Sequence, residues 1–234
     1  MSYQHDATNR YRKYPKTPHL PESPHFDARD DLKLTNVDHL AELTVVVTEK
    51  LDGENTTMYN DHIHARSVDS GPHPSRTWVK ALHGRIAHEI PDGWRICGEN
   101  LYATHSIHYT NLPSYFMVFA IFDDNDTCLS WDDTTEIARS LQLDLVPVLS
   151  RGPFKLIDLA SLANRKSSFG GESEGFVVRN QDSFPYSDFA NHVAKYVRPL
   201  HVGTDQHWMT QLITPNELAP PPGLAPEGGF DISR

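Results

Sequence analysis

One stretch decides what this chain can be: Thr48-Glu49-Lys50-Leu51-Asp52-Gly53-Glu54-Asn55. It continues residues 43–49, which are rich in β-branched side chains and predict a strand. A lysine therefore leaves a strand, and a glycine three residues later lets the backbone turn closely around a ligand. Lysine is a nucleophile only when deprotonated, and its ordinary pKa is about 10.4, so the site around Lys50 is expected to lower that pKa.

Lys-x-Asp-Gly is a weak signal by itself. It occurs by chance in roughly one chain in twenty of this length, and an ordinary Asp-Gly turn after a strand explains it equally well. Other residues with chemical potential follow in a defined order along the chain: Arg66, Glu99, Phe119, the pair Glu174-Gly175, and Lys195. Each of them lies in or next to a strand-like segment. The ordered set is far more specific than any one of its members.

The remaining pattern predicts one α+β domain, built mainly from antiparallel strands with helices packed outside. Apolar residues every four positions predict a helix over 76–90 that ends at Pro91, and residues 59–67 are expected to form the hairpin partner of strand 43–49. Asp132 or Asp133 is expected to cap a helix that runs to residue 141. Further strands are expected at 94–102, 115–123, 173–180 and 191–199, and short helices at 157–165 and 207–212.

We expect three parts in the chain. Residues 1–40 contain four prolines and little periodicity, so they are expected to form an extended arm laid on the domain. The domain itself is expected at 41–213, and residues 214–234 are expected to be a loose, proline-rich tail.

Composition limits the possible classes of protein. No apolar run approaches the roughly 18 residues of a membrane helix, and the polar N-terminus does not look like a signal peptide. Cys97 and Cys128 show no metal or redox spacing, which favours reduced thiols and a cytoplasmic protein. The net charge of −10 argues against nonspecific nucleic-acid binding, but residues 123–144 alone contribute −6 of it. A local basic groove is therefore compatible with the overall charge.

The ordered residues resemble the covalent nucleotidyltransferases, which include ATP-dependent DNA ligases, RNA ligases and mRNA capping enzymes. Thr-Glu-Lys-x-Asp-Gly-x-Asn is most similar to the phage RNA ligases of the second type and their bacterial relatives, although those phage ligases carry histidine where this chain has Asp52. The resemblance covers roughly residues 45 to 200. It implies a ligase-type adenylyltransferase domain, similar to an ATP-grasp domain. About 36 residues follow Arg198, too few for the OB-fold domain of DNA ligases and capping enzymes, so none is expected.

The resemblance also implies roles for individual residues. Lys50 would attack the α-phosphorus of ATP and carry AMP. Glu174 would support a divalent metal, Mg²⁺ or Mn²⁺, with Glu99, which would otherwise hold ribose hydroxyls. Phe119 would stack on adenine, and Lys195 would contact the α-phosphate and stabilise the transition state.

Two further sets of contacts are implied. The nucleotide-binding set comprises Glu49, Lys50, Asp52, Gly53, Asn55, Arg66, Glu99, Phe119, Glu174 and Lys195. The RNA-binding set comprises Asn55, Arg66 and Arg198, although Arg198 lies three residues from Lys195 and would face the other side of a regular strand.

The sequence thus predicts an ATP-dependent RNA ligase that joins a 5′-phosphate to a 3′-hydroxyl through lysyl-AMP and an adenylylated 5′ end. The partners implied are RNA and ATP, and the need for an end-healing kinase or phosphatase stays open. One alternative is a minimal ATP-dependent DNA ligase. Another is a nucleotide- or RNA-binding module of the same fold that does not turn over.

Overall fold

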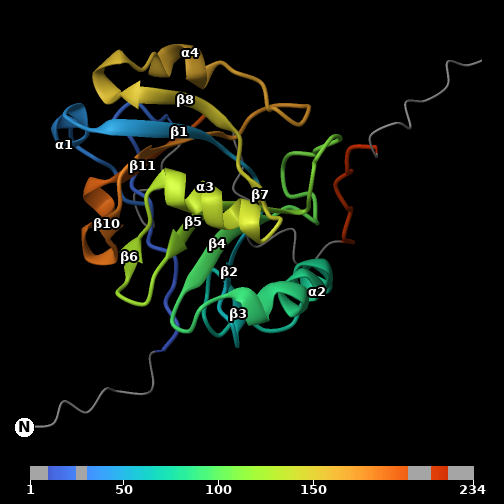
Figure 1. Ribbon diagram of the computed structural model, residues 1–234. Helices are drawn as coiled ribbons and strands as arrows, with labels where there is room; N and C mark the ends of the chain where they lie inside the picture. The colour runs from blue at the N-terminus through green and yellow to red at the C-terminus, as the bar shows by residue number, and fades with distance from the viewer. Residues whose placement is uncertain (1–9, 25–30, 200–211, 221–234) are drawn as a thin grey trace, which may run out of the picture.

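The structure is a computed structural model of the chain and describes residues 10–24, 31–199 and 212–220. Two β-sheets form its framework (Figure 1). The four-stranded sheet has the order β11 (Val193–Val197), β9 (Gly175–Asn180), β1 (Thr44–Lys50), β8 (Val148–Pro153). The seven-stranded sheet has the order β10 (Phe184–Pro185), β6 (Thr127–Cys128), β5 (Phe116–Phe122), β4 (Arg95–Asn100), β2 (Glu54–Met58), β3 (Ile63–Ala65), with β7 (Asp144–Leu145) paired to β5.

Short helices surround the sheets. The α-helices are α1 (Asp38–Ala41), α2 (Thr77–Ile86), α3 (Trp131–Ser140) and α4 (Leu159–Ala163). The 3₁₀ helices are η2 (Pro74–Arg76), η3 (Ala87–Glu89), η4 (Phe154–Leu156) and η5 (Tyr186–Asn191). All named strand pairs are antiparallel except β5 with β7. The predicted α+β class with mainly antiparallel sheets is confirmed.

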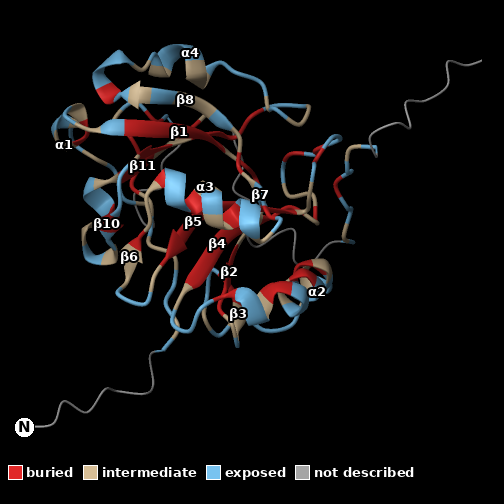
Figure 2. Ribbon diagram, viewed as in Figure 1, coloured by how far each residue is buried: buried red, intermediate tan, exposed pale blue. Residues whose placement is uncertain are grey.

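Apolar side chains pack on both faces of each sheet. Val79, Leu82 and Ile86 of α2 pack with Ala138 of α3 against the outer face of the seven-stranded sheet. A second cluster, which includes Val46 of β1, packs between the two sheets. The central strands are therefore almost wholly buried, while the outward faces of the helices are exposed (Figure 2). This packing makes the sheets a firm support for residues at the strand ends.

The chain changes sheets immediately after Lys50. Strand β1 pairs with β8 and β9, and the backbone then crosses at residues 51–53 to begin β2 in the other sheet. The expected hairpin between 43–49 and 59–67 is therefore wrong, because β3 pairs with β2 instead. Alternation identifies a strand but does not name its partner.

The predicted helices are largely present. Residues 76–90 contain α2 and η3, and α4 lies within 157–165. The expected cap at Asp132 or Asp133 is wrong: helix α3 is capped two or three residues earlier by Ser130, whose side chain accepts from the backbone N–H of Asp133. The expected helix at 207–212 lies outside the described residues apart from its last residue. In the part of the chain that the structure covers, no helix is long and apolar enough to cross a membrane.

Both ends of the described chain pack on the domain. Residues 10–24 run extended over it, as expected for an arm. Residues 212–220 are not loose: Asn216 is buried, and its side-chain amide donates to the carbonyl of Leu101 at 2.8 Å. The backbone N–H of Leu112 donates to the carbonyl of Glu217 at 3.0 Å. The loop at 101–112 pairs with this segment, which composition alone did not reveal.

Candidate active site

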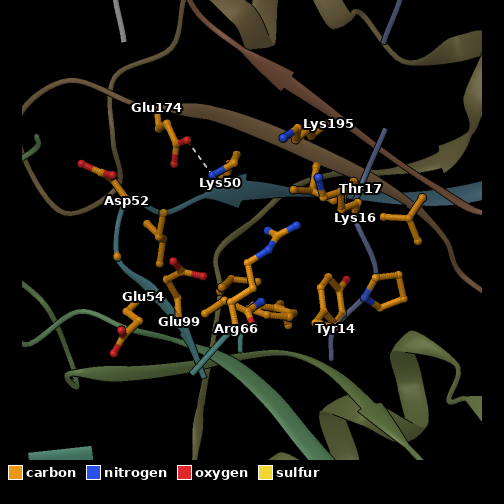
Figure 3. Close-up of a pocket in the computed structure, with 18 of the residues that line it drawn as sticks. Tyr14, Lys16, Thr17, Lys50, Asp52, Glu54, Arg66, Glu99, Glu174 and Lys195 are labelled. Carbon is orange, nitrogen blue, oxygen red and sulfur yellow. Dashed lines mark ion pairs between the residues drawn. The ribbon is translucent and has the colours of Figure 1, made fainter. Parts of the chain in front are cut away.

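A cavity of about 530 Å³ lies between the two sheets (Figure 3). All ten residues that the sequence assigns to the nucleotide line it, together with residues 14–17 of the arm. Lys50, Glu174 and Lys195 belong to the four-stranded sheet or its edge, whereas Asn55 and Glu99 belong to the seven-stranded sheet. The sheets thus bring into one cavity residues that lie far apart in sequence.

Lys50 is the last residue of β1, where five consecutive buried residues give way to a partly exposed one. It lies opposite Gly175 of β9, and this register places its Nζ 2.5 Å from Glu174 Oε1. Burial acts to lower the pKa of Lys50, but the carboxylates of Glu174 and Glu99 outweigh it, so the pKa is raised above the usual value. The depressed pKa expected from the sequence is therefore absent from the protein alone, because carboxylates surround the amine.

The two carboxylates across the cavity are poorly solvated. Burial raises the pKa of Glu99 to about 8, against the opposing effect of Lys50. Burial likewise raises the pKa of Glu174 to about 7, again against Lys50. Among Glu99, Glu174 and Lys50, negative charge therefore exceeds positive charge once both acids ionise.

Lys195 supplies a second amine. It lies in β11, opposite Val177 of β9, and its Nζ is 3.3 Å from Asp31 Oδ1. Burial and the nearby Lys50 lower the pKa of Lys195. Figure 3 shows Lys50 and Lys195 side by side on the same wall of the cavity. The two amines are close enough for the charge of Lys50 to act on Lys195.

Asp52 holds the loop that follows β4. Its Oδ2 accepts from the Ser106 backbone N–H at 2.8 Å, the Ser106 hydroxyl at 2.7 Å and the Ile107 backbone N–H at 2.8 Å. Its own backbone N–H donates to Tyr109 Oη at 2.8 Å. In Figure 3 its carboxylate points away from Lys50. Asp52 lines the cavity but its side chain organises the surrounding loop.

Gly53 allows the turn after Lys50 to touch β4. A Cβ at this position would lie 2.6 Å from the Asn100 carbonyl oxygen and 3.0 Å from Glu99 Cγ. The first distance is shorter than real Cβ atoms show, and the second is tighter than most real Cβ contacts. Glycine is therefore required here by the close approach of β4, while its contact with a ligand stays a prediction.

The other predicted ligand residues approach from the seven-stranded sheet. Asn55 Oδ1 is buried and has no hydrogen-bond partner within the described residues, so this oxygen can accept from a ligand that donates a hydrogen bond. Phe119 is half-buried, with Tyr14 packed edge-on at a ring distance of 4.9 Å. Arg66 is exposed, and its side chain extends into the cavity toward Lys50 (Figure 3).

Two predicted residues have structural contacts. The Oε2 atom of Glu49 accepts from the Ser168 backbone N–H at 2.9 Å, which ties β1 to the loop before β9. Arg198 follows β11, pairs with Glu172 and does not line the cavity. The expectation that Arg198 would face away from Lys195 agrees with this placement.

The comparison with protein families decides the assignment. A family model described as RNA ligase matches residues 43–197, more than half of the chain. The chain belongs to the RNA ligase family. The resemblance recognised in the sequence is confirmed. No curated protein matches the chain in a sequence search.

Solved structures show the same fold. An archaeal ATP-dependent RNA ligase matches with a TM-score of 0.55 and 17% identity, over 80% of this chain and 48% of its own. A Naegleria gruberi RNA ligase variant with ATP and Mn matches with a TM-score of 0.52 and 17% identity, over 70% and 52%. Another variant of that ligase, with AMP and Mn, matches with a TM-score of 0.52 and 18% identity, over 69% and 52%. The chain thus spans about half the length of these structures.

The carboxylates of the cavity suit a divalent metal whose other ligands come from the phosphates of a substrate. Among the residues described, no cluster of three or more His, Cys, Asp or Glu side chains forms a self-contained metal site. Mg²⁺ usually binds through one or two carboxylates plus substrate phosphates and water. Glu99 and Glu174 provide such a pair in this RNA ligase family member. Burial raises their pKa values and so disfavours their ionised forms, which a bound cation would stabilise.

Sequence reasoning missed several residues of the cavity. Glu54 and Arg76 form a two-point ion pair, with Arg76 Nε 2.8 Å from Glu54 Oε2 and Nη2 2.5 Å from Oε1. Glu54 sits inside the lysine motif, so its position was a usable signal. Asp31 gave no such signal, because its sequence neighbours carry no motif. Lys16 lies in residues 9–19, whose mixture of basic and aromatic residues was a weak signal for contact with RNA.

Proposed function

We propose that this chain is an ATP-dependent RNA ligase that seals a 5′-phosphate to a 3′-hydroxyl through lysyl-AMP. The observation that carries the proposal is the amine of Lys50 held 2.5 Å from Glu174, in a cavity that also contains Lys195 and Glu99. Membership of the RNA ligase family supports the class of substrate. The solved relatives with ATP or AMP and Mn support the nucleotide and the metal.

In the first step, Lys50 Nζ attacks the α-phosphorus of ATP. A phosphorus–nitrogen bond forms while the bond from the α-phosphorus to the bridging oxygen breaks, and pyrophosphate leaves. Lys195 lies on the same wall and stabilises the charge that develops on the α-phosphate oxygens. Since Nζ must lose its proton to solvent before attack, the carboxylates that raise its pKa have to be neutralised first.

Glu99 and Glu174 would hold Mg²⁺ or Mn²⁺ together with the phosphates of ATP. Bound there, the ion supplies positive charge that lowers the pKa of Lys50 and stabilises the leaving pyrophosphate. Its charge would also favour the ionised form of both carboxylates, which the protein alone disfavours.

The later steps use the same residues. The 5′-phosphate of RNA attacks lysyl-AMP, which breaks the phosphorus–nitrogen bond and returns the amine of Lys50. The 3′-hydroxyl then attacks the 5′-phosphate, and AMP leaves. We assign Phe119 to the adenine, Asn55 and Arg66 to the phosphate of AMP or of the RNA end, and Arg198 to RNA outside the cavity.

We further propose that the protein acts in the cytoplasm on RNA breaks whose ends already carry the required phosphate and hydroxyl. Its two cysteines are free and buried, which fits a reducing compartment. Breaks with other ends would need a kinase or phosphatase partner. The minimal DNA ligase and the inactive binding module are the rival functions that the following experiments separate.

The test is covalent labelling with α-labelled ATP and Mg²⁺, or Mn²⁺ in a parallel series. We expect wild type to retain an acid-labile label on a denaturing gel and to lose it when pyrophosphate is added. Lys50→Ala should retain none. Lys80→Ala, which removes an exposed lysine of α2 outside the cavity, is the matched control and should label like wild type.

Failure of wild type to label in either metal would contradict the proposed chemistry and favour the binding module. If labelling occurs, a panel of nicked and single-stranded RNA against nicked DNA follows. Sealing of DNA but not RNA would replace the proposed function by that of a DNA ligase.

A further inference from the structure

The N-terminal arm is attached to both sheets. On the seven-stranded side, the backbone N–H of Arg12 donates to Tyr59 Oη at 2.8 Å, and Tyr14 packs against Phe119 and Phe189 at ring distances of 4.9 and 5.2 Å. Residues 10–14 of the arm are therefore fixed to the face and edge of this sheet.

On the four-stranded side, the arm runs beside β11. The backbone N–H of Lys195 donates to the Pro18 carbonyl at 2.8 Å, and the backbone N–H of Leu20 donates to the Lys195 carbonyl at 2.8 Å. The Ser23 hydroxyl accepts from the Val197 backbone N–H at 3.0 Å. Residues 15–17 must cross from one sheet to the other, and they line the cavity as they do so (Figure 3).

This crossing places Lys16 at the mouth of the cavity. Six lysine and arginine side chains are among the lining, and of these only Lys16 and Arg66 are exposed. The more buried Lys50, Lys195 and Arg76 each face a carboxylate. The sixth, Arg179, is buried and donates to backbone carbonyls. The two exposed cations therefore mark the side of the cavity that opens to solvent.

The charge of ATP requires cations at this mouth. A bound triphosphate carries about four negative charges, and unpaired charges of that size need cationic or metal partners. The proposed chemistry places the α-phosphate at Lys50, inside the cavity. In-line attack then puts the leaving β- and γ-phosphates on the side of the α-phosphorus opposite Lys50 Nζ.

We propose that Lys16 binds the β- and γ-phosphates of ATP, and hence the pyrophosphate that leaves. The arm is then part of the nucleotide-binding site and does more than hold the two sheets together. This inference rests on the proposed lysyl-AMP chemistry and adds a residue from outside the matched family region. Loss of Lys16 should therefore affect the first step, which uses the β- and γ-phosphates, and leave the later steps unaffected.

The experiment compares two substrates in Lys16→Ala and Lys16→Gln. The first assay measures lysyl-AMP formation against ATP concentration, and the amount of pyrophosphate that discharges half of the label. The second measures sealing of RNA that already carries AMP on its 5′-phosphate. Lys13→Ala is the matched control, because Lys13 is an exposed lysine of the same arm that does not line the cavity.

We expect both Lys16 variants to need about tenfold more ATP and about tenfold more pyrophosphate, which is the usual effect of one lost charged contact. Sealing of pre-adenylylated RNA should stay within twofold of wild type, and Lys13→Ala should match wild type in both assays.

Three results would overturn the inference: unchanged ATP and pyrophosphate requirements, equal losses in both assays, or a loss confined to pre-adenylylated RNA. Equal losses would indicate a structural role, and the last result an RNA contact. If wild type itself forms no lysyl-AMP, the proposed function fails instead, so the two failures are distinguishable.

Discussion

Replacing Gly53 by alanine tests whether the turn after Lys50 has to touch β4. The new Cβ would lie 2.6 Å from the Asn100 carbonyl oxygen and 2.9 Å from Leu101 Cδ2. The first of these contacts is backbone in a paired strand, so it cannot rotate away. Such overpacking costs about 1–3 kcal/mol. For a protein of this size the unfolding midpoint should fall by about 2–12 °C.

The same clash should impair chemistry. To relieve it, the turn must move away from β4, and Lys50 lies only three residues before Gly53. A displacement of about 1 Å between reacting groups costs about 100-fold in rate. We therefore expect lysyl-AMP formation by Gly53→Ala, measured with α-labelled ATP well below its unfolding midpoint, to fall by about 100-fold.

Gly71→Ala is the matched control for this prediction. Gly71 is exposed, and a Cβ there would meet nothing within 4 Å. We expect it to unfold and label like wild type. If Gly53→Ala also keeps the wild-type midpoint and labelling rate, β4 does not position the turn, and the steric argument is refuted.

Two more variants test how charges in the cavity act. Asp52→Asn should lower the free energy of unfolding by about 1–2 kcal/mol, because it removes the charge that accepts hydrogen bonds from Ser106 and Ile107; a denaturant titration with an unchanged midpoint would contradict this role. Glu99→Gln should be more stable than wild type at pH 8.5 by about 1–2 kcal/mol, although inactive. The reason is that burial raises the pKa of Glu99 to about 8 in the folded protein, above the value of about 4.3 in the unfolded chain. Glu99 therefore does not destabilise the folded protein at low pH, and it destabilises it increasingly as pH rises from about 4.3 to about 8. Thermal unfolding at pH 5 and 8.5 measures this difference, and an advantage that does not grow with pH would rule out a buried, ionising Glu99.

The sequence predicted the strands that carry the site because their composition is distinctive. Residues 115–123 are nearly all apolar, and β5 lies inside the seven-stranded sheet between β4 and β6. The lysine motif, Glu99 and Glu174 each lie at a strand end, where a side chain can leave the core without disturbing it. Their order along the chain matched a known family, and this order was enough to select ten of the residues that line the cavity.

Pairing and contacts across long separations were beyond the sequence. Residues 59–67 alternate as an edge strand should, but alternation does not show that the chain has changed sheets after Lys50. Asp52 was assigned to the nucleotide because it lies in the lysine motif. Its carboxylate instead accepts hydrogen bonds from the backbone N–H groups of residues 106 and 107, more than fifty positions away. No local pattern encodes such a bond.

The division of the site between two sheets explains why the arm matters. The amines and Glu174 belong to the four-stranded sheet, and Glu99 with Phe119 belongs to the seven-stranded sheet. The distance between nucleophile and nucleotide therefore depends on how the sheets are held together. Residues 51–53 make one covalent crossing, and the arm makes another, with contacts on both sides of the cavity.

An arm that crosses the mouth of such a cavity can do two things at once. Its backbone bonds to β11 fix the strand that carries Lys195, so under the proposed chemistry they act on the geometry of the transition state. Its exposed Lys16, in the proposed role, acts on the part of ATP that departs. The first role affects every step that uses Lys195, whereas the second affects only the step that releases pyrophosphate. The choice of substrate therefore distinguishes the two roles of the arm. Sealing of RNA that already carries AMP needs the backbone bonds to β11 but does not need the Lys16 side chain.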